Sequence, residues 1–454
     1  MTLPQPYRPD PRILELGDAF YDPVSAADFP GCTERFWNAA AAGEVGLTAV
    51  DRARHFCRFE PLDGNLGQPL ALRYHGHQFR SYNPDLGDGR GFLFGQLRDG
   101  RGRLLDLGTK GSGQTPWSRF GDGRLTLKGG VREVLATEML QALGVDTSRS
   151  FALFETGEQL ERNDEPSPTR SAVLTRLSHS HIRIGTFQRL AFFEEVADLE
   201  ALVAYCLEHL YGEPADAGAT RLMELVTERT ARLAASYLAA GFVHGVLNTD
   251  NINITGESFD YGPWRFTPTW DVTFTAAYFD HAGLYAFGRQ PEAIQWNLAQ
   301  LAGCLALLVD DHKVLSDQLQ RFPELFHRAL ADALVRRLGI EAGAEAEDRD
   351  LARAITQALS ASPVEIDRFF FDWRGGRRAV EEKWSGEPFE RLAQLLAGRE
   401  QPATHAYWSD QKPCSLHIEE VEAIWSAIAS DDDWSPFHAK IAAIRRMGEA
   451  MAQG

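Results

Sequence analysis

The chain has 454 residues, of which 44% are hydrophobic and 24% charged, and its formal net charge is −18. This composition is typical of a globular protein with a large core and two to three domains. The excess of acidic residues argues against broad binding to nucleic acid or anionic membranes, but a few local basic residues can still form a pocket for ATP phosphates.

The cysteines are scattered, odd in number and form no C-x-x-C motif: Cys32, Cys57, Cys206, Cys304 and Cys414. This pattern predicts reduced thiols in a cytoplasmic protein, without a disulfide framework or a zinc site. The N-terminus lacks the apolar segment of a signal peptide. No apolar run approaches the roughly 20 residues needed to cross a membrane.

Residues 1–68 form an irregular N-terminal extension with short helical hints, such as residues 32–42. A segment rich in short β-like runs follows over residues 69–190, with the runs at 92–97, 103–109, 151–155 and 172–176. One helix interrupts them, because apolar residues recur at helical spacing from Val131 to Leu143 and Gly144 stands where a helix should end.

From about residue 194 the pattern is mainly helical, with predicted helices at 194–211, 221–240 and 292–308. Residues 191–310 would form a helical lobe, and residues 311–454 a further helical extension. The sequence therefore predicts an α+β, protein-kinase-like bilobal fold, with a β-rich N-lobe, a helical C-lobe and extra C-terminal helices.

Lys110 ends one of the β-like runs, and a lysine projecting from a strand is how a kinase-like N-lobe reaches ATP phosphates. Such a lysine needs a carboxylate to hold its side chain. Glu133 lies on the following predicted helix and is the natural partner. For an isolated lysine and glutamate, solvated surface charges would be the usual interpretation.

Two glycine turns of the same composition lie on either side of Lys110. Gly87, Gly89 and Arg90 belong to the first, and Asp122 and Gly123 to the second, which spans residues 121–124. Backbone N–H groups of such turns can approach phosphates, and an arginine adds a fixed charge. Each turn alone also fits an ordinary hairpin.

Arg176 and Arg183 follow the last β-like run, where the chain would cross between lobes, and arginine suits a terminal phosphate. Two surface arginines are the alternative. The segment between them contains one of two H-x-H pairs, residues 179–181, and the other is at residues 75–77. Without a third ligand or a cysteine partner we expect these histidines to pack as polar groups around the cleft and not to bind zinc.

The most informative stretch is residues 244–251, His-Gly-Val-Leu-Asn-Thr-Asp-Asn, followed by Asp-Tyr-Gly at 260–262. It matches the kinase pattern H-[RG]-D-x-x-x-x-N and D-F-G. Asn251 and Asp260 then take the places of the metal-binding residues, and their oxygens suit Mg²⁺ or Mn²⁺. Val246 occupies the position of the usual catalytic aspartate, and its apolar side chain cannot accept a proton.

Asp250 is the candidate to replace the missing base, because it adjoins Asn251 and could accept a proton from an incoming hydroxyl. It could instead be a further metal-site carboxylate or a turn cap.

With these residues in place, the chain resembles the selenoprotein O (YdiU-like) family of protein adenylyltransferases over roughly residues 70–310. The matching segments are residues 74–79 (YHGHQF), 86–90 (LGDGR), 110–119 (KGSGQTPWSR), 132–133 (RE), 172–176 (AVLTR), 182–183 (IR), 244–251 (HGVLNTDN) and 260–263 (DYGP).

The resemblance implies a pseudokinase fold that binds ATP flipped relative to ordinary kinases, and that transfers AMP to Ser, Thr or Tyr hydroxyls of acceptor proteins with release of pyrophosphate. It implies that Lys110 contacts phosphates, Glu133 orients Lys110, and Arg176 and Arg183 bind the γ-phosphate end. It also implies a nucleotide site lined by Gly87, Gly89, Arg90, Asp122 and Gly123. Asn251 and Asp260 would bind Mg²⁺, and Asp250 would be the proton acceptor.

Three other interpretations stay open. The family has also been credited with transfer of UMP from UTP. A catalytically inactive ATP-binding scaffold is favoured by Val246 and disfavoured by the metal pair. A small-molecule phosphotransferase needs the aspartate that Val246 replaces.

Overall fold

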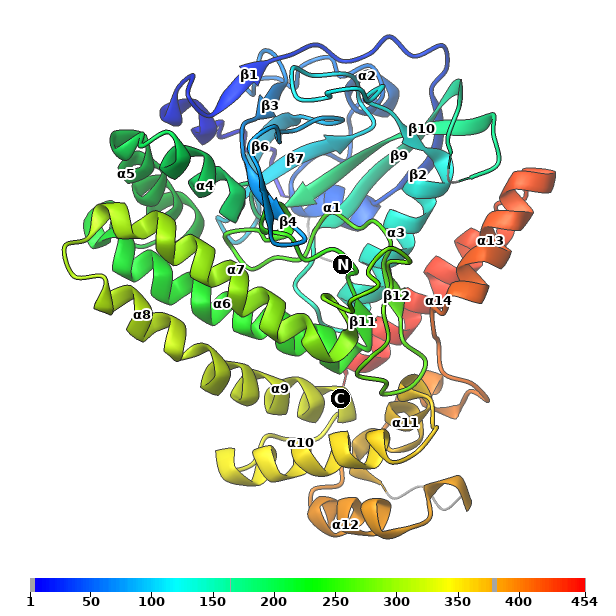
Figure 1. Cartoon of the computed structure of the whole chain (residues 1–454). Helices are drawn as coiled ribbons and strands as arrows, with labels where there is room; N and C mark the ends of the chain where they lie inside the picture. The colour runs from blue at the N-terminus through cyan, green and yellow to red at the C-terminus, as the bar shows by residue number, and fades with distance from the viewer. Residues whose placement is uncertain (1–4, 164, 378–381, 454) are drawn as a thin grey trace.

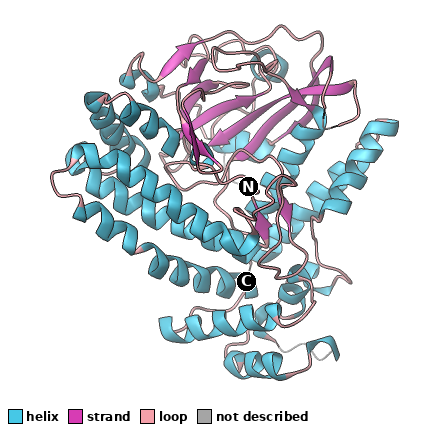
Figure 2. Ribbon diagram, in the orientation of Figure 1, coloured by secondary structure: helices cyan, strands magenta, loops and turns pink. Residues whose placement is uncertain are grey.

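The computed structural model of the chain describes residues 5–163, 165–377 and 382–453. Figures 1 and 2 show a strand-rich lobe above a helical lobe, with further helices below and to the side. This arrangement confirms the expected α+β bilobal plan. None of the described helices is long and apolar enough to span a membrane.

The N-lobe is built on an antiparallel eight-stranded sheet with the order β1-β3-β6-β7-β10-β9-β2, in which β8 also pairs with β10. Its strands are β1 (Tyr21–Pro23), β2 (Thr33–Trp37), β3 (Leu70–Leu72), β6 (Leu93–Arg98), β7 (Leu104–Lys110), β8 (Leu125–Thr126), β9 (Arg149–Leu160) and β10 (Thr169–Ser178).

Strand β7 is buried along its whole length because both faces of the sheet are covered. Leu104 packs in the large core that includes helix α3 (Leu127–Ala142). Leu105 and Leu107 both point to the opposite face of the sheet and pack among aromatic rings such as Phe56. This burial on both sides fixes the end of β7, where Lys110 lies.

Helix α3 begins at a Thr126 cap, whose hydroxyl accepts the Gly129 N–H, and it packs against β9 and β10. Gly144 follows its end with φ +79°, a conformation that favours glycine. The helix predicted over residues 131–143 and its stop are therefore confirmed.

A separate hairpin of β4 (Gly76–Gln78) and β5 (Ser81–Asn83) projects from the N-lobe towards the helical lobe (Figure 1). Its His77 N–H donates to Thr249 Oγ1 over 2.7 Å. Thr249 begins the 3-10 turn Thr249–Asn251 of the predicted catalytic loop, so the hairpin connects the two lobes at the site.

The C-lobe packs around the long helix α6, which contacts both α7 and α9. Its elements are α4 (Ile184–Phe192), α5 (Val196–Tyr205), α6 (Gly218–Ala240), β11 (Phe242–Val243), β12 (Arg265–Phe266), α7 (Gln290–Leu305), α8 (Lys313–Gln320) and α9 (Phe322–Leu338). The short β11–β12 ladder brackets the catalytic loop in sequence and fixes its two ends.

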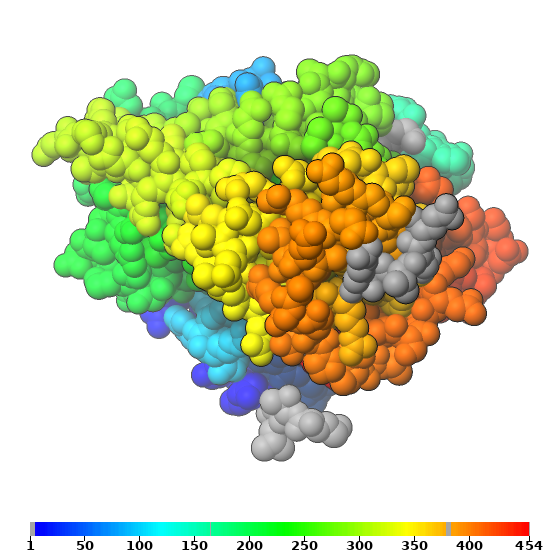
Figure 3. All heavy atoms as spheres, turned by 90° about the horizontal axis from the view of Figure 1, so that it is seen from below, coloured from blue at the N-terminus to red at the C-terminus, as the bar shows by residue number. Residues whose placement is uncertain are grey.

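The C-terminal helices are α10 (Glu345–Ser360), α11 (Ile366–Asp372), α12 (Glu387–Leu396), α13 (Ile418–Asp431) and α14 (Ser435–Ala452). Viewed from below, those that directly follow α9 form much of the lower face, in yellow and orange (Figure 3). The last helix returns to the N-lobe and packs along α3.

The four expected β-runs lie in β6, β7, β9 and β10, and the three expected helices in α5, α6 and α7. The helical hint at residues 32–42 is wrong in its first part, because residues 33–37 form strand β2 along the exposed edge of β9. Helices α1 (Ala39–Glu44) and α2 (Arg52–Phe56) follow it. Strands β1 and β2 bring residues of the N-terminal extension into the N-lobe sheet; the domain boundaries themselves remain predictions.

Cys32 and Cys57 form a disulfide, with their Cα atoms 6.0 Å apart. The expectation that every cysteine is a reduced thiol is therefore wrong for this pair. Cys32 immediately precedes β2 and Cys57 ends α2, and both pack against the aromatic core on the outer face of the sheet. The contact is made by the tertiary fold, so the spacing of the cysteines did not indicate it. Cys206, Cys304 and Cys414 are free and buried.

Candidate active site between the lobes

The Lys110 ammonium donates to Glu133 Oε1 of α3 and, over 2.8 Å, to Asp260 Oδ1. All three come from different parts of the chain: the end of β7, the middle of α3 and the segment after the catalytic loop. The Lys110–Glu133 ion pair expected from the sequence is therefore present, and both side chains are buried.

Asp260 has a second basic neighbour, because Arg176 NH1 of β10 lies 3.3 Å from its Oδ1. Burial by itself would raise the pKa of Asp260, but the charges of Lys110 and Arg176 outweigh it and hold that pKa well below its ordinary value. Asp260 is thus an anion; it has a positive φ of 64° and lines the cavity.

Arg183 is buried at the N-cap of α4 and fixed by long hydrogen bonds of 3.3 Å to Asp88 Oδ1 and to the carbonyl of Asp250. Its guanidinium also lies 4.0 Å from the centre of the Tyr74 ring and 5.1 Å from that of Phe259. These rings hold a buried positive charge in place without neutralising it.

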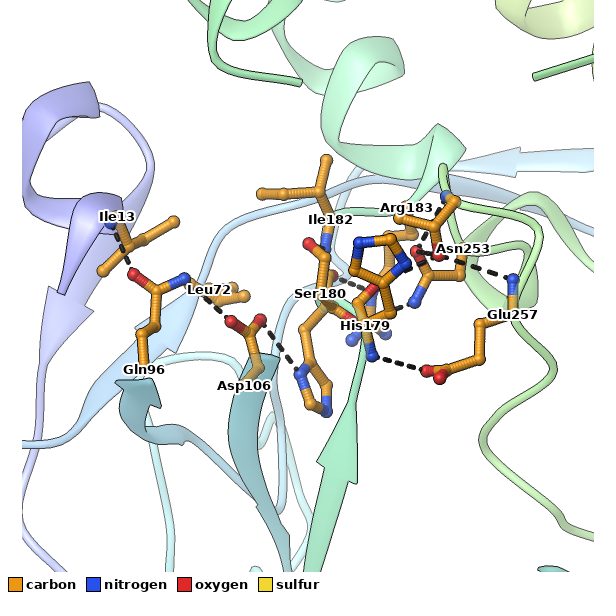
Figure 4. A network of polar contacts seen from close by, with 12 residues as sticks. Ile13, Leu72, Gln96, Asp106, His179, Ser180, Ile182, Arg183, Asn253 and Glu257 are labelled. Carbon is orange, nitrogen blue, oxygen red and sulfur yellow. Dashed lines mark hydrogen bonds and ion pairs between the residues drawn. The ribbon is translucent and has the colours of Figure 1, made fainter. Parts of the chain in front are cut away.

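A polar network behind the cleft holds the crossover segment that carries Arg183 (Figure 4). Asn253 Nδ2 donates to the carbonyl of Ser180 over 2.7 Å, and the His179 N–H donates to Glu257 over 2.7 Å. Further along, Asp106 of β7 accepts from Gln96 and contacts His181 Nδ1 at 3.2 Å. The segment is therefore tied both to the sheet and to the residues that follow the catalytic loop.

Asp250 lies in the turn of the catalytic loop, and its Oδ1 is buried without a hydrogen-bond partner among the described residues. Burial raises the pKa of Asp250 to about 6, against the lowering effect of Arg183. Hairpin strand β4 passes close by, since a Cβ on Gly76 would lie 3.0 Å from that Oδ1. The pKa of Asp250 is thus moved towards neutral pH, the range that suits a group exchanging protons there.

Both glycine turns pack against the segment 113–118, which lies between them in the sequence. A Cβ on Gly87 would lie 2.3 Å from the Trp117 ring, and one on Gly89 would lie 2.9 Å from the Trp117 carbonyl. Gly123 has φ +70° and packs on the Gly113 carbonyl. The glycines are therefore required for close packing, which brings both turns to the rim of the same hollow.

The arginines of these turns differ. Both line the hollow, and the charge of Arg90 contributes to the lowered pKa of Asp260. Arg124 instead pairs with Glu158 through two nitrogens at 2.9–3.0 Å, and Asp122 pairs with Arg162 over 2.8 Å.

Together these residues surround a mainly polar cavity of about 680 Å³, a size that suits a nucleotide. Every predicted site residue lines it except Glu133, which reaches it through Lys110, and Asn251, which neighbours Asp250. The lining residues among the predicted set are Gly87, Gly89, Arg90, Lys110, Asp122, Gly123, Arg176, Arg183, Asp250 and Asp260.

The oxygens present fit a divalent cation bound together with phosphates. Asn251 donates its Nδ2 hydrogen to the carbonyl of Val246 over 2.9 Å, and no described donor occupies its Oδ1. Asp260 supplies an anionic carboxylate. Among the described residues there is no group of three His, Cys, Asp or Glu side chains that could bind a metal without a ligand's help. The H-x-H histidines make polar contacts instead: His75 with Tyr82, and His77 with Gln188.

Sequence reasoning missed several residues that line this cavity or support its lining. Tyr74 and Phe259 stack on Arg183, and Trp117 supports the first glycine turn. Asp88 was within reach, because it lies inside the first glycine turn, but its bond to Arg183 joins residues 95 positions apart.

Comparison with known proteins places the chain. The sequence profile of the family described as "Protein adenylyltransferase SelO" matches residues 6–445. A protein of Synechococcus elongatus called "Protein nucleotidyltransferase YdiU" is 43% identical, with 100% of this chain and 97% of the relative covered. Proteins of the same name from Synechocystis sp. (42% identical, 94% and 96% covered) and Gloeobacter violaceus (43% identical, 96% and 95% covered) are similar to the same degree.

Among solved structures, a rhoptry antigen kinase domain of Toxoplasma gondii is 13% identical and covers 64% of this chain and 83% of its own, with a TM-score of 0.27. A score this low does not by itself establish a common fold. The sequence relationships are decisive: the chain belongs to the protein adenylyltransferase SelO family.

Proposed function

We propose that this protein transfers AMP from ATP to Ser, Thr or Tyr hydroxyls of acceptor proteins and releases pyrophosphate. Family membership supports nucleotidyl transfer as the reaction class. The observation that carries the proposal is the position of the base. Asp250, with its raised pKa, faces the cavity in a loop whose usual catalytic aspartate is replaced by Val246.

The distribution of positive charge supports a flipped nucleotide. Arg176 and Arg183 are buried and line the cavity together with Lys110. The triphosphate end is the most anionic part of ATP, so these groups favour phosphates that point inward. An inward γ-phosphate leaves the α-phosphate nearer the acceptor.

In this proposal Lys110 neutralises phosphate charge and Glu133 fixes the lysine side chain. Gly87, Gly89 and Arg90 form one wall of the nucleotide site, and Asp122 and Gly123 the other. Asp250 accepts the proton as an acceptor hydroxyl attacks the α-phosphorus. Positioning and charge neutralisation would supply most of the acceleration.

Asn251 and Asp260 would hold Mg²⁺ or Mn²⁺, and such an ion, when bound, neutralises phosphate charge. Asp260 now accepts from Lys110 and Arg176, so these bonds would rearrange when a cation and nucleotide enter.

UTP as an alternative donor is compatible with this proposal, because the residues named in it would contact phosphates and not the base. A cytoplasmic location, where ATP is abundant, is part of the proposal. The Cys32–Cys57 disulfide argues against it, since such bonds are uncommon in reducing compartments.

The test is incubation of the purified protein with Mg²⁺ or Mn²⁺ and ATP labelled at the α- or the γ-phosphate, with Asp260→Ala as control. We expect label on protein from α-labelled ATP alone, and none with the variant. Label from γ-labelled ATP would show a kinase and contradict the proposal.

An inactive ATP-binding scaffold is the second candidate, and Val246 is the observation that favours it. It predicts that ATP binds to the wild-type protein and that neither label reaches protein. Retention of Asn251 and Asp260 together argues against it, because a scaffold does not require a pair of cation-binding residues.

A further inference from the structure

Exposed aromatic rings cluster beside the catalytic loop. Phe79, at the tip of the β4–β5 hairpin, is 37% exposed, and Tyr278 and Phe279 are 83% and 42% exposed. The last two lie in the segment that follows β12. We refer to Phe79, Tyr278 and Phe279 as the aromatic surface. Single exposed apolar side chains are common, but several gathered in one patch often mark an interaction site.

The rings of this surface contact one another. The centre of the Phe79 ring lies 5.7 Å from that of Phe279, which lies 5.1 Å from that of Tyr278. Two elements far apart in sequence therefore present one continuous apolar face. Such rings offer a large contact area at a low entropic cost, which is why they are enriched at protein interfaces.

The aromatic surface is fixed to the catalytic loop through Asn248. The Phe79 N–H donates to Asn248 Oδ1 over 3.0 Å, and the hydroxyl of Tyr285 donates to the same atom over 2.7 Å. Tyr285 in turn packs under Phe79, with ring centres 5.0 Å apart. Asn248 is two residues from Asp250, so the surface and the proposed base are positioned by the same loop.

The surface lies outside the nucleotide cavity. Gln78 lines that cavity together with Asp250, whereas its neighbour Phe79 does not, and neither do Tyr278 and Phe279. ATP in the cavity would therefore leave the aromatic surface uncovered. A second molecule that brings a hydroxyl to Asp250 would find the surface directly beside it.

The H-x-H segment extends this face across the hairpin. The guanidinium of Arg80 lies 5.5 Å from the centre of the Trp296 ring, and Trp296 packs against His77 at 5.2 Å. His77 then packs on Tyr82 at 5.0 Å, and Tyr82 stacks on the exposed Phe192 at 5.5 Å. The histidine thus acts as a packing element between two groups of exposed rings.

We propose that the aromatic surface docks the acceptor protein by binding a bulky apolar side chain close in sequence to the hydroxyl that is modified. The inference rests on the proposed AMP transfer and names the chemistry of its acceptor. Docking there would raise the local concentration of the hydroxyl at Asp250. It would also select acceptors by an apolar neighbour, since a polar side chain would gain little from contact with these rings.

The test uses peptides with one central serine and otherwise polar residues, and a series in which one neighbouring position at a time carries phenylalanine. AMP transfer to each is measured with α-labelled ATP. For the wild-type protein we expect kcat/KM to rise about tenfold at one or more phenylalanine positions. In the Tyr278→Ser/Phe279→Ser variant this preference should vanish, while the KM for ATP and the rate with the all-polar peptide stay unchanged.

Leu307→Ser is the matched control, because Leu307 is 45% exposed and lies in a different element, the 3-10 turn Ala306–Leu308. It should keep the preference. Equal rates at every position in the wild-type protein, or a preference that persists in the double variant, would overturn the inference. So would a change of oligomeric state in the double variant on sedimentation, because the surface would then be an interface between copies of this chain.

Failure of the transfer itself would give a different result. If no peptide is labelled by the wild-type protein, the proposed function is contradicted. Binding of the same peptides, followed by fluorescence polarisation, still tests the surface. Tighter binding of phenylalanine peptides to the wild-type protein than to the double variant supports it, and equal binding contradicts it.

Discussion

The polar side chains on the two faces of helix α3 differ in whether they have hydrogen-bond partners. On the cavity side, Glu133 Oε2 is buried without a hydrogen-bond partner among the residues that the structure describes, as are Arg176 Nε and Asp250 Oδ1. On the outer side, both oxygens of Glu138 are bound by Arg445 of α14 at 2.7 and 2.8 Å. Lys128 is likewise paired with Glu422 of α13 at 2.7 Å.

This difference separates a ligand site from a structural contact. A buried polar atom without a partner costs about 1–3 kcal/mol, so two such atoms on residues of the cavity, with a third on Glu133 beside it, favour a site that a ligand completes. The outer side needs no ligand, because the C-terminal helices satisfy it. Variants on the two sides should therefore fail in different ways: activity is lost on one and stability on the other.

The largest effect is expected for Asp250→Asn. The amide keeps the shape of the side chain but cannot accept the proton, so AMP transfer should fall by a factor of about 10² to 10⁴ while ATP binding is retained. Initial rates with α-labelled ATP and calorimetric titration with ATP measure the two quantities. Asp350→Asn, at an exposed aspartate of α10, is the control; an active Asp250→Asn would remove Asp250 from the mechanism.

Glu133→Gln should have the next largest effect. Lys110 would keep Asp260 as a partner but lose the carboxylate that orients it, and small misplacements of a phosphate-binding group cost up to about a hundredfold in rate. We expect a similar loss in kcat/KM for ATP, with little change in the melting temperature. A variant that melts much earlier at unchanged kcat/KM would show that Glu133 is structural.

Arg445→Ala should reverse this pattern. The substitution removes the partner of Glu138, whose side chain is almost fully buried. Because Arg445 is itself 44% exposed, we expect a loss of only about 1–2 kcal/mol in unfolding free energy. Arg446→Ala is the neighbouring control, since its partner Asp410 is much more exposed and solvent screening should leave that pair with little effect on stability. Equal losses for the two variants, measured by urea denaturation, would show that α14 does not hold α3 through Glu138.

The smallest effect near neutral pH is that of protonation. Asp250 must be ionised to accept a proton, and its pKa is raised to about 6, so transfer should be nearly constant above this pH and fall about tenfold per pH unit well below it. If the rate of the Asp250→Asn variant still falls in this way at low pH, the titrating group is not Asp250.

The sequence predicted the parts of the site that depend on local patterns. Lys110 and Glu133 were found because a strand, a turn and a helix follow one another in order, and the catalytic loop because its residues are contiguous. The residues that complete the cavity could not be predicted in this way, because they come from distant parts of the sequence. Tyr74 reaches Arg183 across 109 positions (183 − 74), and the aromatic surface joins the hairpin to a segment about 200 residues later.

The errors have the same origin. Residues 32–42 contain alanines that favour a helix, but pairing with β9 makes residues 33–37 a strand, since tertiary contacts override weak local propensity. The Cys32–Cys57 bond likewise depends on where β2 and α2 meet. In each case the deciding contact is long-range.

The orientation of bound ATP tests the central claim most directly. A crystal structure of the Asp250→Asn variant with Mg²⁺ and a non-hydrolysable ATP analogue would show it. The account predicts the γ-phosphate against Arg176 and Arg183, with the α-phosphorus nearest residue 250. A γ-phosphate beside residue 250, with the α-phosphate at the arginines, would contradict AMP transfer and indicate a kinase.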